Sequence, residues 1–160
     1  MLTLALQGFH DARRRHDSDR LTADATRVFI SAAECVYWAS TMDERLRDWP
    51  GYASFTSSHP IGLLLPGVRY VRNLKTHRLP MTLERIEGAR FPVVFPMVFA
   101  EVVWLPLDKL PPPGQTTKYT PKQESSYAAH MAGFPTRHIF HQLADGFSDL
   151  EAFPESPLSA

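Results

Sequence analysis

Three side chains that could transfer a proton and bind an anion lie close together near the middle of the chain. Arg72, Asn73 and His77 supply a permanent cation, an amide and an imidazole within six residues. An imidazole can move a proton near neutral pH, and a guanidinium can hold a phosphate through two hydrogen bonds. On a helix Asn73 and His77 can meet, so the amide could fix the tautomer of the ring. Arg72 and His77 are about 140° apart around an ideal helix, so they converge only if the helix loosens or two copies of the chain meet.

The sequence Arg72-Asn73-x-x-x-His77 resembles the R-x4-6-H motif of the HEPN superfamily, in which a small polar residue often follows the arginine. This resemblance implies an α-helical, dimeric, metal-independent endoribonuclease of a toxin–antitoxin or phage-defence system, with two motifs joined at the dimer interface. It implies that Arg72 holds phosphate, that His77 is the general acid and base, and that Asn73 orients His77. Three neighbouring cations would attract the nucleic-acid backbone: Arg69, Lys75 and Arg78. No cofactor is expected.

Two other interpretations of the chain stay open. In the first, Arg69 and Arg72 pair with acidic side chains of the preceding helix, and Asn73 and His77 bridge helices. The acidic candidates are Glu34, Asp43 and Glu44. In the second, the chain is a non-catalytic helical interaction protein. It would bind a protein partner, such as an antitoxin or a defence component, through an apolar segment at 91–107 or through its acidic tail.

Other reactive side chains have weaker patterns. His138 and His141 are three residues apart with His130 upstream, but no cysteine pair or HExxH sequence accompanies them, so no metal site is predicted. Cys35 lies beside the apolar stripe of an expected helix, which favours a buried thiol over a nucleophile. The basic run Arg13–Arg15 is typical of a solvated patch.

The placement of proline divides the chain into two halves of different expected structure. None of the 14 prolines lies in residues 1–49, and 11 lie from Pro80 onward. Because proline lacks an N–H and clashes with the preceding turn, the first half favours long helices and the second favours strands, turns and short helices. Apolar residues spaced by three and four predict the helices. These are expected at 22–49, with Thr22 as N-cap, at 60–79, at 121–134 and at 136–147.

The remaining segments complete the expected architecture. β-branched and aromatic residues between prolines favour one or two strands around 91–107. Residues 50–59 are expected to form a loop and residues 151–160 to be loose. Residues 1–20 are expected to be loose, as a frayed lead-in, or to contain a short helix. The predicted fold class is mainly α, a HEPN-like helical bundle with this small β element, and α+β is the alternative.

Length, charge and cysteine content limit the classes of protein. A chain of 160 residues predicts a single domain over 1–160. Its net charge is zero, so a strongly basic nucleic-acid-binding face is not expected, although a local basic site is compatible. One cysteine excludes an intrachain disulfide and favours a reducing cytoplasm. The longest apolar run contains Glu101 and three prolines, so no membrane partner is expected. We therefore expect a cytoplasmic homodimer with RNA or a protein as its partner.

Overall fold

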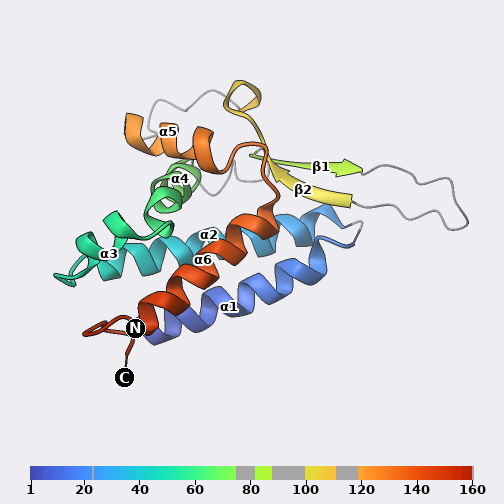
Figure 1. The fold of residues 1–160 in the computed structure, drawn as a ribbon. Coiled ribbons are helices and arrows are strands. Elements are labelled where there is room, and N and C mark those ends of the chain that lie inside the picture. Colours follow the sequence, from blue (N-terminus) through green and yellow to red (C-terminus); the bar gives the residue numbers. More distant parts are fainter. Residues whose placement is uncertain (23, 75–81, 88–99, 111–118, 160) are drawn as a thin grey trace, which may run out of the picture.

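Six α-helices and one two-stranded antiparallel sheet form the part of the chain that the structure describes (Figure 1). The computed structural model describes residues 1–22, 24–74, 82–87, 100–110 and 119–159. In chain order the elements are α1 (Leu2–Asp19), α2 (Ala25–Leu46), α3 (Tyr52–Ser58), α4 (Ile61–Asn73), β1 (Leu83–Glu87), β2 (Ala100–Trp104), the short 3-10 helix η2 (Leu107–Lys109), α5 (Pro121–His130) and α6 (Thr136–Glu151). The prediction of a mainly α fold with a small β element is confirmed. Within these residues no helix combines the length and the apolar character needed to cross a bilayer.

Helices α1 and α2 form an antiparallel hairpin, and α6 lies along it (Figure 1). Phe9, Ala12 and His16 of α1 are fully buried, at spacings of three and four residues that place them on one face. Of the two expectations for residues 1–20, the loose lead-in is therefore wrong, and the helix is longer than the short one expected. The charged run that follows Ala12 obscured an apolar stripe that packs into the same core as the rest of the fold.

Three boundaries in the first half differ from those expected. Asp24, not Thr22, caps α2, because its carboxylate accepts the Arg27 amide at 3.2 Å. Residues 52–58 form the helix α3 instead of a loop, with its two aromatic side chains packed inward. Helix α4 ends at Asn73, earlier than the expected end near 79.

Helix α5 contributes the hydroxyl of Ser126 to the hydrogen bonds of the α4 backbone beside Pro66. Pro66 lies inside α4, where a proline weakens the hydrogen-bond ladder. The Gly67 amide donates to Ser126 Oγ at 2.9 Å, and the Ser126 hydroxyl donates to the Leu63 carbonyl at 2.5 Å. In an uninterrupted helix that amide and that carbonyl would bond to each other. The two helices approach so closely that a Cβ on Gly67 would lie 2.8 Å from the sulfur of Met131.

Ser126→Ala is expected to lower the free energy of unfolding by about 1–3 kcal/mol, because the buried Gly67 amide and the part-buried Leu63 carbonyl both lose their hydrogen bond to the hydroxyl. Urea denaturation followed by circular dichroism measures this change. Ser125→Ala, on the exposed side of the same helix, is the matched control and should change the value by less than about 0.5 kcal/mol. Equal effects of the two variants would contradict a structural role for the inserted hydroxyl.

Strand β2 lies within the predicted 91–107 segment, but its partner β1 was not expected. The strands pair with Leu83 opposite Trp104 and Glu87 opposite Ala100. Leu83 is buried whereas Glu84, Arg85 and Ile86 are exposed, so β1 lacks the alternation that marks a strand in sequence. Residues 91–99 of the predicted segment lie outside the described residues.

The C-terminal segment, expected to be loose over 151–160, is mostly exposed over 151–159 but contacts the rest of the fold at a few residues. Helix α6 continues to Glu151, and Phe153 makes edge-to-face contacts with Trp49 and Phe55 at ring-centroid distances of 5.8 and 5.4 Å. Ser156 is buried, and its hydroxyl accepts the Leu158 amide. These contacts attach residues 151–159 to the end of the bundle formed by α2 and α3.

Candidate functional site

The last turn of α4 carries the first two residues of the motif. Arg72 and Asn73 are its final residues, and Leu74 caps the helix with its amide directed at the carbonyls of the preceding turn. His77 lies outside the described residues, as do Lys75 and Arg78. Because α4 ends at Asn73, the separation of about 140° between Arg72 and His77 on one straight helix does not apply.

Among the described residues, Arg72 has one ionic partner, which is half-exposed. Its Nη1 lies 3.0 Å from Oε1 of Glu44 on α2, and the two side chains are 48% and 47% exposed. An exposed pair of this kind contributes about 0–1 kcal/mol to stability, because water solvates both charges well. A phosphate could therefore replace Glu44 at this guanidinium with little loss of stability.

Arg69, one turn earlier, is held in a different way. Its Nε and Nη2 donate to the two carboxylate oxygens of Asp43 at 2.7 and 3.0 Å. Asp43 is fully buried, and it also accepts Arg47 Nη2 at 2.6 Å and the Tyr52 hydroxyl at 2.9 Å. Burial and contact with this carboxylate raise the pKa of Tyr52. Arg69 thus has a structural role that joins α2, α3 and α4, and no described residue accepts a hydrogen bond from its Nη1.

The structural interpretation of the arginines identified the right elements. Two of the three candidate acids, Asp43 and Glu44, hold Arg69 and Arg72, as that interpretation proposed. Glu34 instead pairs with Arg15 of α1 at 2.5 Å. Sequence reasoning did not foresee that one pair would be buried and the other exposed, because this depends on how α2 and α4 cross.

Asn73 faces α5. Its Nδ2 lies 3.5 Å from Oε1 of Gln123, a long hydrogen bond. Gln123 also completes the capping box of α5 by accepting the Thr120 amide at 3.0 Å. Within the described part of the chain no group donates to Oδ1 of Asn73, so this oxygen is free to accept a hydrogen bond from an imidazole.

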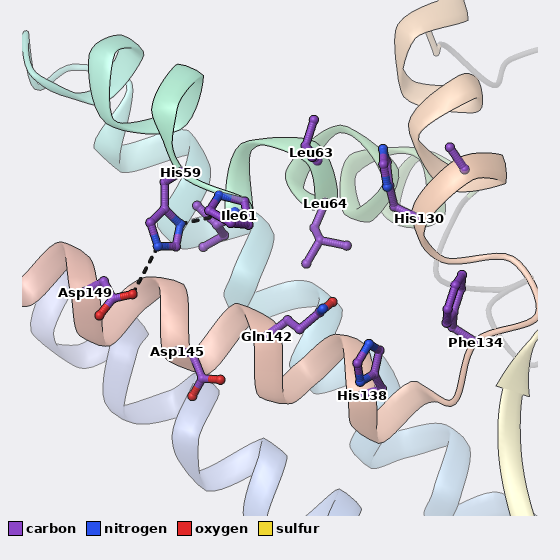
Figure 2. Close-up of a pocket in the computed structure, with 12 residues that line it drawn as sticks. His59, Ile61, Leu63, Leu64, His130, Phe134, His138, Gln142, Asp145 and Asp149 are labelled. Carbon is purple, nitrogen blue, oxygen red and sulfur yellow. Dashed lines mark hydrogen bonds and ion pairs between the residues drawn. The ribbon is translucent and has the colours of Figure 1, made fainter.

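A pocket of about 390 Å³ lies between the start of α4, the end of α5 and the outer face of α6 (Figure 2). His59 accepts the Ile61 amide at Nδ1 (3.2 Å) and faces Asp149 with Nε2 (3.0 Å), so the neutral ring carries its proton on Nε2. Three polar side chains of α6 line the pocket without a hydrogen-bond partner among the described residues: His138, Gln142 and Asp145. The 90 residues between His59 and Asp149 explain why no local pattern revealed this pair.

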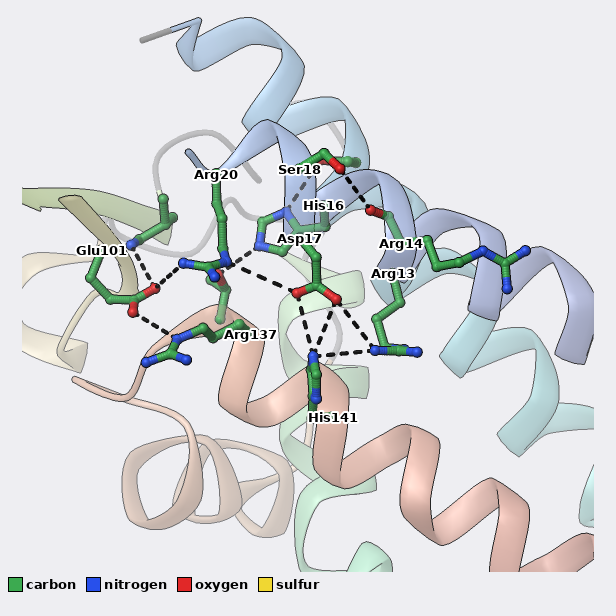
Figure 3. Close-up of polar contacts among 12 residues, drawn as sticks. Arg13, Arg14, His16, Asp17, Ser18, Arg20, Glu101, Arg137 and His141 are labelled. Carbon is green, nitrogen blue, oxygen red and sulfur yellow. Dashed lines mark hydrogen bonds and ion pairs between the residues drawn. The ribbon is translucent and has the colours of Figure 1, made fainter. Parts of the chain in front are cut away.

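A network of ion pairs joins α1 to α6 and β2 (Figure 3). Asp17 contacts Arg13 Nη1 at 3.3 Å and His141 Nε2 at 3.2 Å. Glu101 contacts Arg137 Nε at 2.8 Å and Arg20 Nη1 at 3.8 Å. The basic run is thus not purely a solvated patch, since Arg13 is largely covered by this network.

The three histidines of the C-terminal half do not form a common site. His130 and His138 line the pocket of Figure 2, whereas His141 faces Asp17 in Figure 3. Among the residues that the structure describes, no group of three or more histidine, cysteine, aspartate or glutamate side chains is placed to hold a metal ion.

Burial argues against two further candidates, the Cys35 thiol as a nucleophile and part of the segment at 91–107 as a binding surface. Cys35 is fully buried, as expected, and burial raises the pKa of its thiol, so it is poorly suited to act as a nucleophile. Val102, Val103 and Trp104 of the apolar segment at 91–107 are also buried. This part of the segment therefore cannot supply an exposed patch for a protein partner.

Comparisons of the chain with protein-family models, with curated proteins and with solved structures found no match.

Proposed function

We propose that the chain is a HEPN-like, metal-independent endoribonuclease of a toxin–antitoxin or phage-defence system, acting as a cytoplasmic homodimer. The observation that supports this function best is the state of Arg72. Its guanidinium is half-exposed at the end of α4, is held by one exposed carboxylate, and is five residues from His77. A cation presented in this way is available to a phosphate, in contrast to the buried pairing of Arg69.

The proposed reaction uses the 2′-hydroxyl of the RNA as its nucleophile. His77 of one copy accepts the proton of that hydroxyl, whose oxygen attacks the adjacent phosphorus. His77 of the second copy donates a proton to the departing 5′ oxygen. Arg72 stabilises the negative charge that develops on the phosphoryl oxygens. The products are a 2′,3′-cyclic phosphate and a 5′-hydroxyl end, so that atoms and charge balance without a metal ion.

Cleavage of a labelled single-stranded RNA in the presence of EDTA tests this function. The wild-type protein is expected to produce 2′,3′-cyclic phosphate ends and to leave a DNA of the same sequence intact. His77→Ala is expected to reduce the rate by about 10²–10⁴-fold, as the loss of a general acid or base does. Arg72→Ala is expected to reduce it by about 10²–10³-fold, as the loss of an oxyanion donor does.

Glu44→Gln is the matched variant for Arg72, since it removes the carboxylate that competes with phosphate and leaves the arginine in place. Its cleavage rate should equal or exceed that of the wild type. Thermal unfolding of each variant checks that the fold is retained. RNA cleavage at the wild-type rate by a folded His77→Ala protein would contradict the proposal.

A further inference from the structure

A second cavity, of about 380 Å³, lies at the start of α6 and is lined by Phe134, Pro135, Arg137, His138 and His141. Its size falls in the range of pockets that bind small ligands. We propose that this cavity binds one nucleotide unit, with the base stacked on Phe134 and the phosphate held by Arg137 and His141. The proposal is independent of cleavage at the Arg72 motif, because it uses none of the residues of that motif.

Phe134 offers a flat aromatic surface that is held in place. The side chain is 43% exposed, so part of its ring is accessible to a ligand. Its ring lies nearly parallel to that of His138, at 21° and 6.0 Å between centroids, and Figure 2 shows the two side by side. The backbone is fixed because the Trp104 amide donates to the Phe134 carbonyl at 3.1 Å and the Gly133 amide donates to the Trp104 carbonyl at 2.7 Å. A base could therefore stack here with little ordering of the protein.

The first turn of α6 places a cation where the helix itself disfavours it. Arg137 lies in this turn, which contains no acidic residue. The N-terminal end of a helix carries partial positive charge, so cationic side chains there are opposed and anions are favoured. A phosphate beside Arg137 would reverse this unfavourable interaction.

Two carboxylates hold Arg137 and His141 and leave part of each side chain available. Glu101 contacts Arg137 at Nε, and no other described residue forms a hydrogen bond or ion pair with that guanidinium, so Nη1 and Nη2 can donate to two oxygens of a phosphate. Asp17 holds His141 through Nε2, and Arg13 Nη1 lies 3.2 Å from the same nitrogen. Figure 3 shows Arg137 and His141 on α6 beside these partners. Three arginines against two carboxylates leave the network positively charged: Arg13, Arg20 and Arg137 face Asp17 and Glu101.

Calorimetric titration with three probes tests the site: inorganic phosphate, AMP, and a 2′-O-methyl tetra-adenylate that cannot supply a 2′-hydroxyl for cleavage. We expect AMP and the oligonucleotide to bind, and phosphate alone to bind at least tenfold more weakly. Phe134→Leu and Arg137→Gln should each weaken binding of AMP and of the oligonucleotide by roughly tenfold or more, because stacking and a charged contact are lost. An oligonucleotide that binds much more tightly than AMP identifies a nucleic-acid strand as the ligand, and equal binding identifies a free nucleotide.

Matched controls separate this site from general changes in charge or exposed surface. Arg45→Gln, on the exposed side of α2, and Phe153→Leu, at the far end of α6, should change binding less than twofold. His77→Ala should bind both probes as the wild type does, so loss of cleavage and loss of this site are distinguishable. Unchanged binding by Phe134→Leu and Arg137→Gln, or no binding of AMP and oligonucleotide at millimolar concentration, would overturn the proposal.

Discussion

Replacing Asp43 with alanine is expected to lower the free energy of unfolding by about 3–5 kcal/mol, because removing one member of a buried ion pair leaves its partners unpaired. Asp43 is fully buried and accepts hydrogen bonds from Arg69, Arg47 and Tyr52. Without the carboxylate, the half-buried Arg69 guanidinium would lose both of its hydrogen bonds. Urea denaturation at neutral pH, followed by circular dichroism, measures the loss.

The adjacent residue is a matched control for this substitution. Glu44→Ala removes a carboxylate one position along the same helix, but Glu44 is half-exposed and holds only Arg72 among the described residues. Its removal should lower the free energy of unfolding by at most about 1 kcal/mol. If Asp43→Ala and Glu44→Ala had equal effects, Asp43 would not be the junction of α2, α3 and α4.

The stability of the fold is expected to fall by about 3 kcal/mol as the pH is lowered from 6.5 to 4 through the titration of His16 alone. Burial lowers the pKa of His16 from 6.5 to about 4. Its ring lies between Ser31 Oγ, 3.2 Å from Nδ1, and Thr136 Oγ1, 2.7 Å from Nε2. Ser31 directs its own proton to backbone carbonyls of α2, so Nδ1 donates and Nε2 accepts, which fits the neutral ring.

The direction of this effect follows from proton binding. Above pH 6.5 the histidine is neutral in both the folded and unfolded states, and its contribution to stability is fully present. Between 6.5 and 4 the unfolded chain binds a proton that the folded protein does not, so the free energy of unfolding decreases as the pH falls. Denaturation series from pH 7 to 4 on the wild type and on His16→Gln measure the difference. Parallel pH dependences of the two proteins would contradict it.

Helices with clean apolar periodicity could be predicted, and those with interrupted stripes could not. Residues 25–46 carry an apolar stripe along their whole length, and α2 forms there. In α1 the stripe is followed by Arg13, Arg14 and Arg15, so local reasoning gave the charges more weight than Phe9 and Ala12. Phe9 and Ala12 are buried because α2 and α6 pack against α1, and the sequence of α1 alone does not show this. Residues 52–58 are too short for a helix to be stable by itself, and α3 depends on burial of Tyr52 and Phe55.

In the candidate site, too, the sequence indicated which residues could pair but not which pair would be buried. The spacing of Arg69 and Arg72 on one helix and of Asp43 and Glu44 on another made pairing foreseeable. Which pair would be buried was not foreseeable, because it depends on the crossing of α2 and α4. The cavity lined by Phe134 and Arg137 gave one local signal that was missed: a cationic side chain, Arg137, in the first turn of a predicted helix, where it is opposed by the helix dipole.

The hydroxyl of Ser126 inserted into α4 also has a consequence for the order in which the protein is made. Gly67 and Ser126 are 59 residues apart, so α4 is synthesised about 3–12 seconds before α5 at usual translation rates. During that time the amide of Gly67 and the carbonyl of Leu63 lack the Ser126 hydroxyl, whereas the α1–α2 hairpin can form from local contacts. The helix that presents Arg72 gains its contacts with α5 only after α5 emerges from the ribosome. A nascent chain that has not yet reached α5 would thus carry its proposed RNA-cleaving motif on a helix without this support.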